Sequence, residues 1–121
     1  MNKKEINAMT DEELCVKADE LLYPGNRINF FCYKLARFYP GDYEEYDWVP
    51  NYPNDIEAAW ELVEKLQEME LYPNIENVGI RGFLWNIWLT LPGNTEDEII
   101  AQDENVKRAI TKAFIMAMES E

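Results

Sequence analysis

The sequence predicts an α+β fold in which a small antiparallel sheet is sandwiched between helices, giving α-β-α layers. Apolar side chains recur at helical spacing between residues 54 and 69, and again in an alanine-rich stripe from Val106 to Ala117. Between these helices, apolar side chains occupy every second position from Phe83 to Leu91, which is typical of a strand with one buried face. A chain of 121 residues is long enough for one core and too short for two, so we expect a single domain over residues 1–121.

A first helix is predicted over residues 10–22. Thr10 and Glu13 have the spacing of a capping box, in which each side chain accepts a hydrogen bond from the backbone N–H of the other residue. Apolar residues follow at helical spacing from Leu14, and a Pro-Gly pair that begins at Pro24 ends the helix.

Residues 23–53 show no clear period. The apolar residues between Arg27 and Phe38 alternate poorly, so a short helix and an irregular strand both remain open. A second Pro-Gly pair then predicts a turn. The acidic and aromatic residues that follow it indicate a surface loop held in place by one apolar anchor, Trp48.

The clearest helix is predicted over residues 54–69, with Asn54 as its N-cap. Trp60 is the largest side chain of the apolar stripe on this helix, so we expect it to anchor the core. We also expect this stripe to pack on the apolar face of the strand. The stripe comprises Ile56, Ala59, Trp60, Val63 and Leu66, and the strand face comprises Phe83, Trp85, Ile87, Leu89 and Leu91.

A hairpin and a final helix complete the expected fold. The segment Pro92–Thr95 supplies a turn, after which residues 98–101 return as an antiparallel strand. Asp103 is the predicted N-cap of the last helix. The core stripe of this helix is Val106, Ala109, Ile110, Ala113, Phe114 and Ala117.

The charge and composition argue against an enzyme and against duplex nucleic acid as a partner. The chain has 24 acidic and 11 basic residues, a net charge of −13, and no histidine. Without histidine, the usual general base and the commonest transition-metal ligand are both missing. No metal, phosphate or dinucleotide motif occurs, so we expect no cofactor and no metal site. A surface this acidic repels the phosphates of a duplex.

A cytoplasmic location, in the host cell if the chain is viral, is expected by default, and the cysteines are expected to be reduced there. Cys15 and Cys32 form no CxxC pair, so we expect both to be small buried apolar residues. No run of apolar residues is long enough to span or anchor in a membrane, and the N-terminus lacks the apolar stretch of a signal peptide.

The segment from Tyr52 to Leu66, YPNDIEAAWELVEKL, carries a resemblance to a known family. Together with the helix at residues 10–22, the tryptophan-containing strand and the closing helix from Val106 to Met118, it resembles the phage ABA-sandwich domain family. That family occurs mainly in phage and prophage proteins of unknown function. The resemblance implies an α-β-α layered fold and transfers no catalytic residue, because the family has no established reaction.

One stretch combines positive and aromatic side chains without any acid. The segment from Tyr23 to Tyr39 carries three basic residues, whereas the rest of the chain holds 8 bases and 24 acids. Basic side chains bind phosphate and rings stack on bases, so this pattern predicts a site for a nucleotide or a short single strand. The predicted ligand-binding residues are Arg27, Phe30, Phe31, Tyr33, Lys34 and Arg37. The alternative is a core segment whose basic residues pair with nearby acids.

An acidic and aromatic segment is the second candidate site. Its spaced carboxylates could mimic a phosphate backbone or dock on a basic host protein, and the alternative is a solvated loop. Its residues are Asp42, Tyr43, Glu44, Glu45, Tyr46, Asp47 and Trp48. A further cluster, Glu96, Asp97 and Glu98 with Asp103 and Glu104, matches no known cation-binding loop.

The basic and aromatic segment predicts a non-catalytic binding protein that sequesters a phosphate-bearing signal, and the resemblance implies that it is encoded by a phage or prophage and acts against a host defence. An acidic inhibitor of a host protein, or a nucleic-acid mimic, is the first alternative. An enzyme that uses carboxylates and a divalent cation is the second. An open hairpin edge and the mixed strand face around Trp88 also leave a homo-oligomer open.

Overall fold

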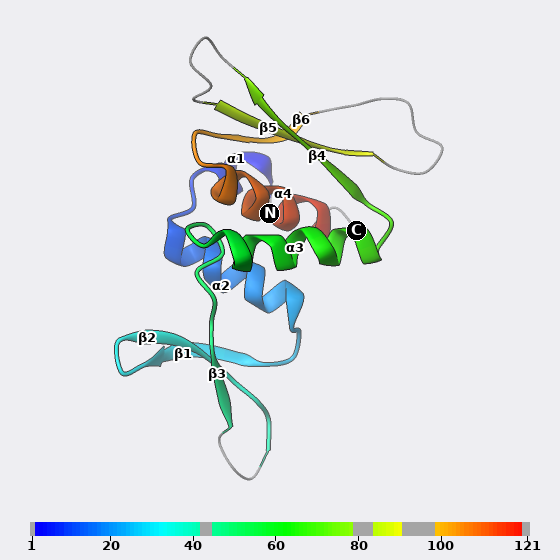
Figure 1. The fold of residues 1–121 in the computed structure, drawn as a ribbon. Coiled ribbons are helices and arrows are strands. Elements are labelled where there is room, and N and C mark those ends of the chain that lie inside the picture. The colour runs from blue at the N-terminus through cyan, green and yellow to red at the C-terminus, as the bar shows by residue number, and fades with distance from the viewer. Residues whose placement is uncertain (1, 42–44, 79–83, 91–98, 120–121) are drawn as a thin grey trace.

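The computed structural model of this protein describes residues 2–41, 45–78, 84–90 and 99–119. Helices and antiparallel strands are both present, which confirms the predicted α+β class (Figure 1). The elements, in chain order, are α1 (Lys3–Asn7), α2 (Asp11–Leu22), β1 (Arg27–Phe31), β2 (Lys34–Phe38), β3 (Tyr46–Trp48), α3 (Ile56–Glu68), β4 (Tyr72–Val78), β5 (Leu84–Thr90), β6 (Ile99–Asp103) and α4 (Val106–Glu119).

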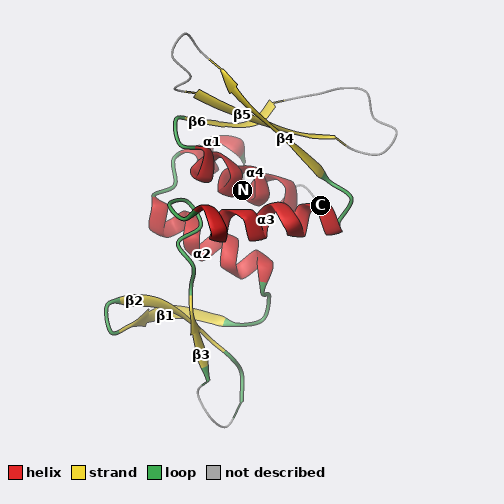
Figure 2. Cartoon of the chain, in the orientation of Figure 1, coloured by secondary structure: helices red, strands yellow, loops and turns green. Residues whose placement is uncertain are grey.

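The described strands form two sheets where the sequence predicted one. The first sheet has the order β1-β2-β3 and the second has the order β4-β5-β6. Figure 2 shows the helices lying between the two sheets, so the layers differ from the expected helix–sheet–helix sandwich. The additional sheet comes from residues 27–48, where the apolar pattern has no period. Helix α4 is central, because it contacts the other helices as well as β5 and β6.

The first predicted helix, α2, is confirmed together with its capping box. The Thr10 hydroxyl accepts a hydrogen bond from the Glu13 backbone N–H at 3.2 Å, and the Glu13 carboxylate accepts one from the Thr10 N–H at 3.1 Å. On the inner face of this helix, Leu14 and Ala18 are fully buried. The short helix α1 was not predicted, although Asn2 caps it by accepting from the Glu5 N–H at 2.8 Å.

Helix α3 forms where the sequence predicts it, but it is turned differently about its axis. Its N-cap is Asp55 instead of Asn54, and its buried face is Ala58, Ala59, Leu62, Val63 and Leu66. The buried face is centred near Leu62 and Leu66, and Trp60 and Ile56 lie on another side of the helix. These two side chains are 47% and 51% exposed, so the assignment of Trp60 to the core is wrong.

The second sheet confirms the predicted strand and its return strand. Strand β5 pairs antiparallel with β6, and Ile87 is fully buried while Trp85 and Leu89 pack against the core. This face lies against α4, and α3 instead contacts β4. Phe83, Leu91 and the turn at 92–95 lie outside the described residues. Strand β4 was not predicted because its Pro73 suggests a break, yet proline is tolerated on an edge strand.

Helix α4 also begins with a different cap from the predicted one. Asn105 accepts a hydrogen bond from the Lys107 backbone N–H at 2.9 Å, and Asp103 is the last residue of β6. The predicted core stripe is buried except for Val106, which is partly buried. Thr111 and Ile115 are buried as well, because neighbours cover α4 on several sides. None of the described helices is long and apolar enough to cross a membrane.

Candidate functional site

The residues of the basic and aromatic segment form the β1–β2 hairpin of the first sheet. The pairing is antiparallel, with Arg27 opposite Phe38 and Phe31 opposite Lys34. The two turn residues, Cys32 and Tyr33, both have positive φ, at 51° and 67°, as a tight two-residue hairpin turn requires. Neither is a glycine or an asparagine, so the usual sequence signal of such a turn is missing.

Four rings gather on the face of this sheet that points away from the helices. Tyr46 is the centre of the group, with ring centroids 5.0 Å from Phe31, 5.9 Å from Phe38 and 5.3 Å from Trp48. Side chains of directly opposed residues share a face, which is why β3 adds its rings to those of β1 and β2. Ala36 lies on the same face, opposite Trp48, and has no exposed surface.

Two cations flank these rings. The guanidinium carbon of Arg27 lies 5.0 Å from the centroid of the Phe38 ring, and the Lys34 Nζ lies 5.5 Å from that of Trp48. We call this surface the aromatic face. It consists of Arg27, Phe31, Lys34, Phe38, Tyr46 and Trp48, with Asn29 and Ala36 between them. None of these eight positions on the described strands is acidic, although the protein carries a net charge of −13.

The opposite face of the first sheet holds a buried polar network. The Arg37 guanidinium donates to both carboxylate oxygens of Asp19 on α2, at 2.8 and 3.2 Å. The hydroxyl of the fully buried Tyr52 donates to the same carboxylate at 2.7 Å. Arg37 also donates to the Tyr39 hydroxyl at 2.6 Å and stacks on the Tyr23 ring at 3.8 Å. We call Asp19, Arg37 and Tyr52 the clamp, because they join the first sheet to the helices.

Arg37 and Tyr52 of the clamp, and Tyr39 beside it, each keep one charge state at neutral pH. Burial alone would lower the pKa of Arg37, but the hydrogen bonds and charge of Asp19 outweigh it and raise that pKa above its ordinary value. Burial, together with the hydrogen bond to Asp19, raises the pKa of the Tyr52 hydroxyl. The hydrogen bond to Asp47, at 2.6 Å, likewise raises the pKa of Tyr39. None of these three groups is therefore placed to act as a base, and the network is structural.

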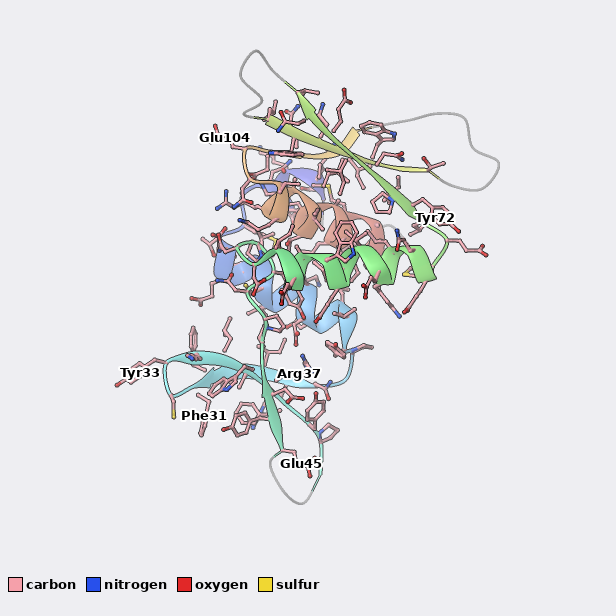
Figure 3. The ribbon with its side chains drawn as sticks, in the orientation of Figure 1. Phe31, Tyr33, Arg37, Glu45, Tyr72 and Glu104 are labelled. Carbon is pink, nitrogen blue, oxygen red and sulfur yellow. The ribbon has the colours of Figure 1, made fainter. Side chains whose placement is uncertain are left out.

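The structure brings together part of the predicted ligand-binding set. Arg27, Phe31 and Lys34 share the aromatic face, and Figure 3 shows Phe31 on the side of the sheet away from the helices. Tyr33 is fully exposed at the tip of the hairpin, and the alternation of β1 places Phe30 on the other face. The remaining member, Arg37, is only 5% exposed in the clamp. Arg37 therefore follows the alternative prediction, in which a basic residue of this segment pairs with a nearby acid, here Asp19.

The acidic and aromatic segment divides between the two faces. Tyr46 and Trp48 belong to the aromatic face, whereas Asp47 points to the other side and accepts from Tyr39. Trp48 is 44% exposed and so is not the predicted apolar anchor; Tyr52 fills that role. Glu45 is exposed, and the three residues before it lie outside the described residues. They are Asp42, Tyr43 and Glu44.

Two basic residues of α4, Arg108 and Lys112, form structural ion pairs. Arg108 contacts Asp11 at 2.8 Å and Asp103 at 3.2 Å, and Lys112 contacts Asp103 at 2.8 Å. The hydrogen bond from Arg108 lowers the pKa of Asp11. Residues 96–98 of the predicted acidic cluster are not described; of its two other members, Asp103 forms these ion pairs and Glu104 is exposed. Within the described ranges, no group of three or more histidine, cysteine, aspartate or glutamate residues could hold a metal ion.

The cysteines differ in their surroundings. Cys15 is buried as predicted, and burial raises the pKa of its thiol to about 11, which keeps it protonated and a poor nucleophile. Cys32 is exposed in the hairpin turn, so the prediction of burial is wrong for it. Its exposure follows from the tight turn, which the sequence pattern did not reveal.

A hollow borders the aromatic face at its Arg27 end. It has a volume of about 220 Å³ and is lined by Gly25, Arg27, Phe38, Tyr39, Pro40 and Gly41. No protein-family model matches this chain, and no curated protein or solved structure shows significant similarity to it. The resemblance to the phage ABA-sandwich family therefore stays a prediction.

Proposed function

We propose that this chain is a non-catalytic binding protein whose aromatic face recognises a nucleotide-type ligand or a short single strand of nucleic acid. The observation that carries this proposal is a set of four rings, three of them exposed, with a cation at each end, on a face whose described strand positions carry no acid. Rings stack on bases of any sequence, and arginine and lysine bind the phosphates.

The rings of the aromatic face contribute little to the core of the protein. No residue of the first sheet belongs to the main buried cluster among the described residues. Phe31, Tyr46 and Trp48 are each more than 40% exposed, and they contact one another instead of the helices. An exposed patch of large apolar side chains of this kind marks a binding surface more often than a structural one.

The arrangement of the cations favours a short ligand. Lys34 and Phe38 are four residues apart on β2, a distance of about 13 Å along a strand, and Arg27 lies opposite Phe38. Phosphate groups at the two ends would leave the bases over the rings, with the hollow beside Arg27 at one end. A short ligand brings few negative charges, so the net charge of −13 opposes it far less than it opposes a duplex.

The biological setting of the proposal comes from the resemblance to the phage family. It supports a phage or prophage origin and a role in the cytoplasm of the host. A protein that binds a nucleotide without reacting with it lowers the free concentration of that nucleotide. The proposed role is therefore that of a host-defence antagonist, which sequesters a nucleotide signal.

The test is a binding titration at about 0.15 M salt, where exposed charges are screened as in the cell. Anisotropy with a labelled short oligothymidylate and calorimetry with cyclic and linear nucleotides give the affinities. Replacing Phe31 and Trp48 with alanine should weaken binding by about 1–3 kcal/mol for each stacked base that is lost. Trp60→Ala is the matched control, because it removes an exposed ring from another surface.

A second pair of variants tests the charge. Lys34→Gln should weaken binding, and Lys4→Gln, which removes the same charge from an exposed position on α1, should not. The proposal fails if no ligand of the panel binds, or if the Phe31 and Trp48 variants bind as tightly as the unchanged protein.

A further inference from the structure

The exposed side of α3 carries two large apolar side chains one helical turn apart. Ile56 and Trp60 are about half exposed, and residues four apart lie next to each other on a helix. Tyr72 lies where the chain leaves α3 for β4 (Figure 3). Its side chain is 48% exposed. Among the described residues, the core that α3 helps to form is completed by its other face, so Ile56 and Trp60 are not needed for it.

A row of four exposed glutamates runs along the same helix beside this apolar pair. Their spacing of three or four residues places them on one stripe. Like charges at this spacing repel one another, and only Glu57, in the first turn, gains from the helix dipole. One basic residue of the helix, Lys65, contacts the last of the four at 3.8 Å. The glutamates are Glu57, Glu61, Glu64 and Glu68.

We propose that this side of α3 binds a basic amphipathic helix of a partner protein. The apolar side chains of such a helix would cover Ile56 and Trp60, and its lysines and arginines would pair with the glutamates. The apolar side chains of the partner helix would supply its anchors, as in other complexes that recognise amphipathic helices, and electrostatic complementarity would set the choice of partner. The surface is separate from the aromatic face, which is on the first sheet.

The charges argue against a second copy of this chain as the occupant. Two α3 helices packed against each other would bring their glutamate rows together, in molecules that each carry a net charge of −13. Opposing like charges across an interface cost several kcal/mol in general, whereas a cationic helix turns the same row into an attraction.

The test uses a synthetic amphipathic helix of leucine and lysine as the probe, titrated at about 0.15 M salt. The unchanged protein should bind it. The variant Ile56→Ser/Trp60→Ser keeps every charge and changes only exposed positions, and it should lose affinity by about tenfold or more, as for a hot-spot side chain. Phe31→Ala is the control on the aromatic face and should bind the probe as the unchanged protein does.

General attraction between an acidic protein and a cationic peptide is tested with two charge-matched variants. The first variant carries Glu57→Gln, Glu61→Gln and Glu64→Gln on α3. The control carries the same change at three exposed glutamates outside α3, Glu12, Glu20 and Glu76. The first variant should weaken binding more than the control. Equal losses in the two variants, or equal binding by Ile56→Ser/Trp60→Ser, would overturn the proposal. A dimer in sedimentation experiments that Trp60→Ser dissociates would also overturn it, in favour of a second copy.

Discussion

Breaking the clamp should destabilise the protein strongly. Asp19 is fully buried and accepts three hydrogen bonds, two from Arg37 and one from Tyr52. Asp19→Ala leaves a buried guanidinium without its counter-charge and a buried hydroxyl without its acceptor. Removing one partner of a buried ion pair typically costs about 3–5 kcal/mol, and we expect Asp19→Ala to lower the free energy of unfolding by this amount.

The double variant Asp19→Leu/Arg37→Met separates the loss of the ion pair from the cost of leaving one buried charge unpaired. It removes both charges and fills the space with apolar side chains, so it should be more stable than Asp19→Ala. Urea unfolding, followed by the fluorescence of the tryptophans, gives the free energies of unfolding. Two results would refute the reasoning: a loss below about 1 kcal/mol for Asp19→Ala, which is the range of an exposed pair, or a double variant less stable than the single one.

Three further predictions follow from the described side chains. Trp60→Ala should change the free energy of unfolding by less than about 1 kcal/mol, against about 3–5 for a buried tryptophan, as urea unfolding can show. The hydrogen bond from Arg108 lowers the pKa of Asp11 in the folded protein, so the pair stabilises the fold above the unfolded pKa of 3.8 and loses this contribution as the pH falls through the lowered folded pKa. The free energy of unfolding of Asp11→Asn should therefore depend less on pH between about 5 and 3 than that of the unchanged protein. Cys32 should react with a thiol reagent at neutral pH much faster than Cys15, with mass spectrometry as the readout, and similar rates would contradict the burial of Cys15.

The helices could be predicted because their signals are local. The Thr10 capping box specifies the start of α2 through contacts between residues three apart. Helical spacing predicted α3 and α4 within a few residues of their ends. The rotation of α3 could not be predicted in the same way, because it depends on what the other elements cover. The stripe through Leu62 and the stripe through Trp60 are both apolar, and only the packing chooses between them.

The first sheet could not be predicted because it depends on an unusual turn and on a contact between residues far apart in the sequence. Its hairpin turns at Cys32 and Tyr33, two residues that rarely take positive φ. The apolar period of β2 is broken by Arg37, whose partner Asp19 lies 18 residues earlier on α2. A charged residue on the inner face of a strand hides the alternation on which sequence analysis depends.

This same arginine decides which face of the first sheet is presented to solvent. Side chains alternate along a strand, so fixing Arg37 against α2 turns its neighbours on β2, Ala36 and Phe38, to the other side. The pairing with β3 then adds Tyr46 and Trp48 to that side. A register shift of one residue would bury these rings against the helices and expose the guanidinium. The clamp therefore sets the register on which the proposed binding depends. A clamp variant that still folds should lose affinity for the proposed ligand even though no residue of the aromatic face has changed.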